Sequence, residues 1–140
     1  MNLSFTVYGT PIQQGNLRAG PHITGQRTKL YCADGKKLRP WRQEVAGTAQ
    51  SLMDGAQPTR DAVEVVVHFY FAKPKSTPKR IEHKTTKPDI DKLERGILDA
   101  LTGIAFHDDA QVVSVRKTKQ FGLPERAELT VRTIEGGIEI

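Results

Sequence analysis

The chain of 140 residues is long enough to form one domain that buries a hydrophobic core without disulfides or metals. Its 26% charged and 37% hydrophobic residues are typical of a globular protein and exclude a disordered chain. No apolar run approaches the length of a membrane span. The lone Cys32 excludes an intramolecular disulfide and a cysteine zinc site, and it suits a reducing cytoplasm. The net charge of +5 favours a polyanionic partner.

The first half of the chain predicts two strands and one helix. Residues 2–8 alternate in polarity like a strand, with none of the features of a signal peptide. Residues 10–38 are rich in Gly and basic residues and predict a long functional loop, in which Arg18, Arg27 and Lys29 are candidate DNA contacts. Pro40 fits the first turn of a helix running to about Met53. Residues 63–71 are apolar on nearly both faces, as in a central strand.

The excess positive charge lies in residues 73–87, which we call the basic arm. The arm holds six of the 21 basic residues but only one of the 16 acidic ones, so the rest of the chain carries no net charge. Its prolines and its lack of apolar periodicity predict an exposed segment. We expect it to contact DNA phosphates, although a solvated linker is the alternative. The basic residues concerned are Lys73, Lys75, Lys79, Arg80, Lys84 and Lys87.

The second half predicts a helix followed by two strands. Apolar residues recur at three- and four-residue steps over 90–102, which predicts a helix with one buried face, and Gly103 is a natural stop. Residues 110–119 and 127–133 alternate like strands. The chain is therefore expected to be a single mixed α+β (α/β) domain over residues 1–140. The expected order is β-α-β-α-β-β, with two helices and a mixed four-stranded sheet.

Two aspartates stand at the start of the 90–102 helix. Asp89 is at the expected N-cap, and Asp91 is in the first turn. Helix amide groups help to keep both carboxylates ionised, and such a pair is suited to bind Mg²⁺ or Mn²⁺. An ordinary cap with a favourable first-turn acid is the alternative interpretation.

A third carboxylate follows the helix in Asp108-Asp109. The helix from Asp91 to Thr102 is about 17 Å long. The seven residues after Thr102 span about 23–25 Å when extended. An extended return along the helix would therefore bring Asp109 to Asp89 and Asp91. Because neighbouring side chains of an extended segment point to opposite sides, we expect Asp109 to face the pair and Asp108 to face solvent or nearby backbone.

The combined pattern resembles the RusA-type Holliday junction resolvases. Their motif P-D-x-D-N-L-x-K-x-x-x-D-A-L is matched over residues 88–101, and D-D-A-Q-V-V is matched over 108–113. The resemblance implies Mg²⁺-dependent paired cleavage of four-way (Holliday) DNA junctions by a homodimer in recombination and repair, with Mn²⁺ as a substitute. It also implies a bacterial or phage-encoded protein of the cytoplasm.

The resemblance carries the metal-binding aspartates over to Asp89, Asp91 and Asp109. Two positions depart from the motif, because Lys92 replaces the usual Asn and Arg95 replaces the usual Lys. Both are cationic and are expected to stabilise charge on the phosphate while the metal activates a water. For Arg95 the alternative is pairing with acids four residues away on the helix.

Two rival functions stay open at this point. A non-catalytic junction- or branched-DNA-binding protein could use the same basic arm, and it would need neither metal nor aspartates. Another metal-dependent phosphohydrolase could use the same carboxylates.

Overall fold

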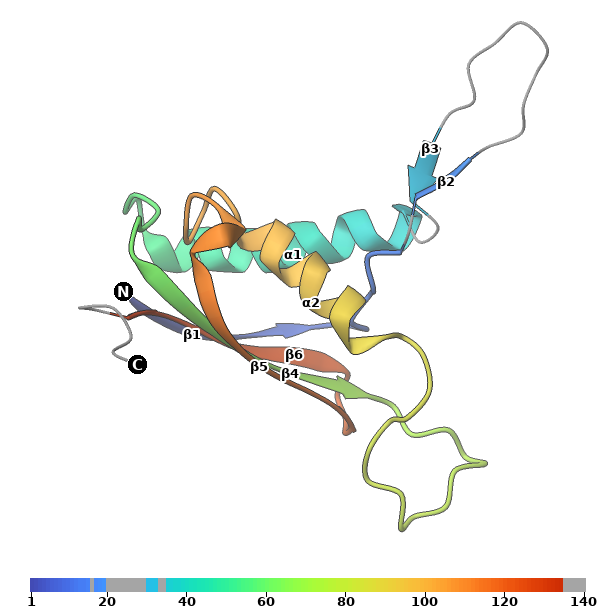
Figure 1. The fold of residues 1–140 in the computed structure, drawn as a ribbon. Helices are drawn as coiled ribbons and strands as arrows, with labels where there is room; N and C mark the ends of the chain where they lie inside the picture. Colours follow the sequence, from blue (N-terminus) through green and yellow to red (C-terminus); the bar gives the residue numbers. More distant parts are fainter. Residues whose placement is uncertain (16, 20–29, 33–34, 135–140) are drawn as a thin grey trace, which may run out of the picture.

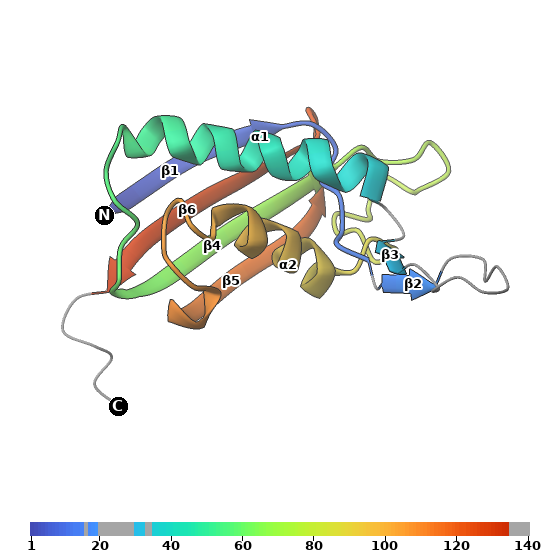
Figure 2. The same cartoon turned by 90° about the horizontal axis from the view of Figure 1, so that it is seen from above.

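Two helices lie on one face of a four-stranded sheet (Figures 1 and 2). The computed structural model describes residues 1–15, 17–19, 30–32 and 35–134. Across the sheet the strands run β1 (Asn2–Tyr8), β6 (Arg126–Ile134), β4 (Ala62–Phe71) and β5 (Val112–Phe121). β4 is parallel to β5, and the other neighbours are antiparallel. The predicted mixed sheet with two helices in the order β-α-β-α-β-β is confirmed.

The core lies between the sheet and the helices. α1 (Gly35–Met53) lies over β1 and β6, whereas α2 (Ile90–Leu101) lies over β4 and β5 (Figure 2). Alternate residues of β4 point into this layer, and four apolar residues of α2 meet them. Neither helix, nor any other in the described residues, is long and apolar enough to cross a membrane. The buried hydrophobic side chains of β4 and α2 are Val63, Val65, Val67, Phe69, Phe71, Leu93, Ile97, Ala100 and Leu101.

The segment 10–38 is not the uninterrupted loop that the sequence predicts. β2 (Leu17–Ala19) and β3 (Leu30–Cys32) form an antiparallel pair within it. Strands of three residues are too short to show a polarity alternation, so the pattern gave no signal for them. Arg18 lies in β2, but its side chain is not described, and Arg27 and Lys29 lie outside the described residues.

α1 begins at Gly35, five residues before the predicted start at Pro40. Pro40 lacks an N–H, so only the Lys36 carbonyl, near the start of the helix, loses its helical donor. The inward face is as predicted, because Trp41, Val45 and Ala49 are buried.

The connection from β4 to β5 fixes where the ends of α2 lie. β4 and β5 are parallel, so α2 must run back against them between the end of one strand and the start of the other. The start of α2 therefore lies beyond the end of β4, next to the basic arm. Both views also place the β2–β3 pair at this end of the molecule (Figures 1 and 2). The basic arm and the β2–β3 pair thus flank the helix start.

Candidate active site

The Asp89 carboxylate at the start of α2 is available to a ligand. Asp89 occupies the N-cap with extended backbone angles, but its side chain makes no capping hydrogen bond. The ordinary capping interpretation of Asp89 is therefore wrong. Instead, the carboxylate is 41% exposed and lies 3.5 Å from the Lys92 ammonium. Asp91 follows in the first turn and is exposed.

The peptide group that joins Pro88 to Asp89 is held at both of its polar atoms. The Asp89 N–H donates to Gln13 Oε1 at 3.0 Å. On the other side, Lys119 Nζ donates to the Pro88 carbonyl at 2.7 Å and to the Thr86 carbonyl at 2.6 Å. Burial lowers the pKa of Lys119, and the nearby Lys84 acts in the same direction, whereas Asp89 opposes it. The aspartates thus start from a fixed backbone.

The cations on α2 differ in their surroundings. Lys92 is half-buried beside Asp89, as described above. Arg95 is exposed and takes part in none of the ion pairs formed by the described residues. The alternative interpretation, in which Arg95 pairs with acids four residues away on the helix, is therefore not found among the described residues. Glu94, which lies near the apolar face, reaches Lys117 of β5 at 3.3 Å.

Asp109 does not reach Asp89 and Asp91 within the chain. After Thr102 the chain turns tightly, since the Gly103 N–H donates to the Phe106 carbonyl at 2.7 Å and Gly103 has a φ of +84°. The fully buried Phe106 then anchors the turn under the end of the helix. The expected extended return along α2 is wrong.

Parallel pairing explains where Asp109 lies. It is the first residue of the 3₁₀ helix η1 (Asp109–Gln111), which leads directly into β5. Gln111 Nε2 donates to the carbonyls of Thr59 and Asp61, both 2.9 Å away, and so attaches η1 beside the start of β4. The start of α2 lies at the other end of these strands. Figure 2 shows η1 and the start of α2 at opposite ends of the helix.

Asp108 caps η1. Its side chain therefore binds nearby backbone, as expected from the sequence. Its Oδ1 accepts from the Ala110 N–H at 2.9 Å, and this hydrogen bond holds the pKa of Asp108 below its usual value. The pKa of Asp109 is raised, first by a side-chain hydrogen bond with Asp108, then by desolvation and by the negative charge of Asp108. The Asp99 charge contributes in the same direction. The bridge between Thr102 and Phe106 keeps the chain before η1 at the C-terminal end of α2.

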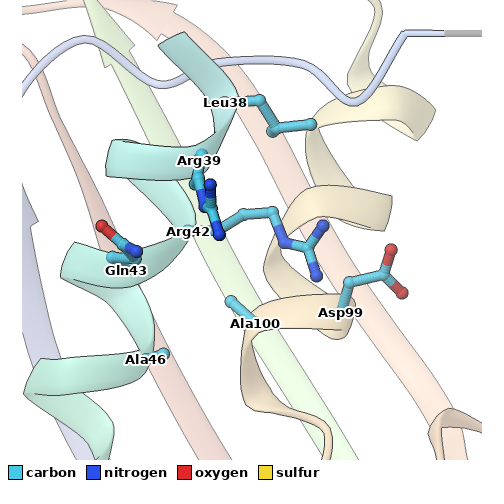
Figure 3. Close-up of a pocket in the computed structure, with 7 residues that line it drawn as sticks. All are labelled: Leu38, Arg39, Arg42, Gln43, Ala46, Asp99 and Ala100. Carbon is cyan, nitrogen blue, oxygen red and sulfur yellow. The ribbon is translucent and has the colours of Figure 1, made fainter. Parts of the chain in front are cut away.

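A groove between the two helices borders Asp99. It is lined by Arg39 and Arg42 of α1 and by Asp99 and Ala100 of α2. Figure 3 shows the Arg42 side chain extending across the groove toward the Asp99 carboxylate. Asp99 thus has basic neighbours on α1. Among the described residues, no three Asp, Glu, His or Cys side chains are grouped so that they could hold a metal.

The match to a protein family covers most of this architecture. The model of the family described as Endodeoxyribonuclease RusA matches residues 9–132. The chain belongs to the RusA endodeoxyribonuclease family. It is also 30% identical over 145 residues to an uncharacterized protein, YqaN, from Bacillus subtilis (strain 168), covering 94% of this chain and 96% of that protein. RusA-family membership indicates an endodeoxyribonuclease that acts on DNA junctions.

In this RusA-family chain the basic arm loops out beyond the end of the sheet, and lysines near its two ends contact aromatic rings of β4 and β5 (Figure 1). Lys84 Nζ lies 5.3 Å from the centroid of the Phe71 ring, and Lys73 Nζ lies 5.7 Å from that of Phe121. These two lysines are half-buried, so they hold the arm in place as well as carrying charge. The other four basic residues are exposed, as predicted: Lys75, Lys79, Arg80 and Lys87.

Sequence reasoning missed Gln13 and Lys119. Gln13 lies 76 residues before Asp89, in a segment without periodicity, and nothing in the pattern marks it. Lys119 could have been found from the sequence, because it follows Val115 and Lys117 at two-residue steps on the face of β5 that the helices cover. A lysine at such a position needs a polar partner, which here is the backbone before Asp89.

Proposed function

We propose that this RusA-family protein is a Mg²⁺-dependent endonuclease that cuts four-way DNA junctions as a two-fold homodimer. The observation that supports this most is the start of α2. There, the Asp89 carboxylate, which makes no capping hydrogen bond, lies beside Lys92, and the exposed Asp91 follows in the first turn. A carboxylate that neither caps its helix nor is buried contributes little to stability, which favours a functional role. We expect the protein to work in the cytoplasm of a bacterium or of a phage-infected cell.

The donor atoms fit a hard divalent cation. Asp89 and Asp91 supply carboxylate oxygens, which Mg²⁺ and Mn²⁺ prefer, and proteins bind Mg²⁺ through one or two carboxylates together with water and substrate phosphate. When bound, such a cation polarises a phosphate oxygen and lowers the pKa of an attacking water. The donor set at the start of α2 is therefore consistent with the role that we assign to it.

The chain's own residues would bind and orient the phosphodiester. Lys92 lies beside Asp89, and Arg95 projects into solvent one turn further along α2. Both are placed to offset the charge that develops on the phosphate during hydrolysis. The exposed cations of the arm would bind flanking phosphates, which fixes the position of the DNA without reading its sequence.

The homodimer gives Asp109 a role that one chain does not allow. In one protomer Asp109 lies in η1, at the far end of α2 from Asp91 (Figure 2). A two-fold axis repeats each surface on both subunits, so the Asp109 side of one protomer can face the Asp89 side of its partner. We therefore assign Asp109 to the site of the partner. Two such sites would cut the two symmetric strands of a four-way junction.

The test compares wild type with Asp91→Asn on a labelled four-way junction and on a linear duplex of the same sequence. Wild type is expected to cut the junction only with Mg²⁺ or Mn²⁺. Asp91→Asn is expected to lose cleavage and to keep or gain junction affinity, because a negative charge near the phosphates is removed. Binding without metal-dependent cleavage by wild type would instead support the non-catalytic junction-binding alternative.

A further inference from the structure

The Lys119 side chain ties the strand β5 to the backbone that carries the aspartates. Lys119 pairs with Phe69 in the parallel register and lies on the helix-facing side of the sheet, where it is half-buried. Its ammonium donates to two carbonyls, those of Thr86 and Pro88, at 2.6 and 2.7 Å. Among the described residues it forms no ion pair with a carboxylate. Its hydrogen bonds therefore go to backbone directly before Asp89.

The two carbonyls are placed to control the direction in which α2 starts. The Pro88 carbonyl and the Asp89 N–H belong to one peptide group. Lys119 binds the carbonyl, and Gln13 binds the N–H at 3.0 Å. Hydrogen bonds on both sides of a planar peptide group oppose its rotation, which would swing the Asp89 side chain. No capping hydrogen bond from Asp89 itself replaces this restraint.

We infer that Lys119 is a positioning residue, which clamps the Pro88–Asp89 peptide so that Asp89 and Asp91 are already oriented when a divalent cation binds. The inference rests on the proposed function, since it assigns a cation to this carboxylate pair. A restraint of this kind lowers the entropy lost on binding, as the outer-shell partners of metal ligands do. Lys119 need not touch DNA for this purpose, so its loss should affect the cation more than the junction.

Lys119→Met tests the clamp, with Lys117→Met as the matched control. Methionine keeps the aliphatic stem of lysine but removes its donors. Lys117 lies two residues earlier on the same side of β5 and is also half-buried, but it pairs with Glu94 instead of the backbone before Asp89. Binding of Mn²⁺ is followed by the loss of the free-ion EPR signal. Junction affinity without metal, the Mg²⁺ dependence of cleavage and the melting temperature are measured on the same samples.

Lys119→Met is expected to weaken Mn²⁺ binding by about tenfold or more, the effect typical of removing an outer-shell partner. The Mg²⁺ concentration for half-maximal cleavage should rise in parallel. Junction affinity without metal should match that of Lys117→Met, whose cation binding should equal that of wild type. If Lys119→Met folds poorly, Lys119→Arg decides the matter, because a guanidinium keeps the charge and donates to two carbonyls. This variant should then fold and bind Mn²⁺ much better than Asp91→Asn.

Three results would overturn the clamp. The first is Mn²⁺ binding by Lys119→Met that equals wild type. The second is an equal loss of Mn²⁺ binding in the Lys117 control, which would indicate general destabilisation. The third is a folded Lys119→Arg that binds Mn²⁺ no better than Asp91→Asn. A wild-type protein that does not cut junctions with Mg²⁺ would instead refute the proposed function, whereas a cutting wild type with an unaffected Lys119→Met refutes the clamp alone.

Discussion

A mixed dimer of Asp91→Asn and Asp109→Asn protomers would show whether each active site draws on both chains. Asp91 and Asp99 are eight residues apart on α2, which is about 12 Å along the helix axis. Asp109 lies at the far end, in η1 before β5. Ligands of one Mg²⁺ each place an oxygen about 2.1 Å from the ion, so their oxygens lie within roughly 4 Å of each other. Asp91 and Asp109 of the same chain are too far apart to meet this condition.

The expected activity follows from counting intact sites. If Asp109 serves the partner's Asp89 and Asp91, the mixed dimer has one site with both defects and one site with none. It should nick junctions at about half the wild-type rate and should fail to make paired cuts, since one of two symmetric sites works. If all three aspartates served their own chain, both sites would be defective. Both homodimeric variants should be inactive in either case.

The assay uses two affinity tags, so that only mixed dimers are purified from co-expressed chains. A dimer of Asp91→Asn with wild type sets the reference, because it keeps one intact site under either arrangement. A dimer of wild type with the double variant, Asp91→Asn and Asp109→Asn in one chain, gives the converse result. It should be inactive if sites draw on both chains and half-active if they do not. An inactive Asp91→Asn/Asp109→Asn dimer beside an active reference would refute the shared site.

Three further predictions concern the arm, a buried carboxylate and a helix glycine. Replacing the exposed arm cations Lys75, Lys79 and Arg80 by Ala should reduce the slope of log affinity against log salt by about two to three in junction-binding titrations, and an unchanged slope would identify the arm as a linker. Hydrogen bonds from the Ser114 hydroxyl and the Arg132 guanidinium hold the pKa of the buried Glu64 below its usual value. The ionised Glu64 therefore stabilises the folded protein fully above the unfolded pKa of about 4.3, and this stabilisation is lost as the pH falls through the lower folded pKa. Glu64→Gln should therefore cost about 1.5–3 kcal/mol of unfolding free energy at pH 7, with a smaller difference near pH 3, by urea unfolding; a difference that grows toward low pH would contradict the assignment. Gly96→Ala in α2 should stabilise by up to about 1 kcal/mol, because the added Cβ would meet its nearest neighbours at an ordinary 3.6 Å, and a lower melting temperature would show that the helix interface has no room for it.

The parts of the fold that follow from local pattern were predictable. The apolar spacing of α2 and the mostly apolar run of β4 each bury residues in the layer between sheet and helices, so the local pattern alone indicated both. The start of α1 was not predictable in the same way. Proline is favoured in the first turn of a helix, but five helical residues precede Pro40. The proline therefore marked a position that a helix tolerates and not the residue at which α1 begins.

The position of Asp109 could not be read from chain length. Seven extended residues are long enough to return along α2, but length only sets what the chain can reach. What decides the position is that β4 and β5 are parallel, because a parallel crossover delivers the residues after the helix to the end of the sheet opposite its start. The periodicity of a segment indicates that it is a strand, but it does not indicate whether the neighbouring strand runs parallel or antiparallel to it. The motif residues thus include two groups at opposite ends of α2, and this separation in one chain is the reason to look for the complete site between two protomers.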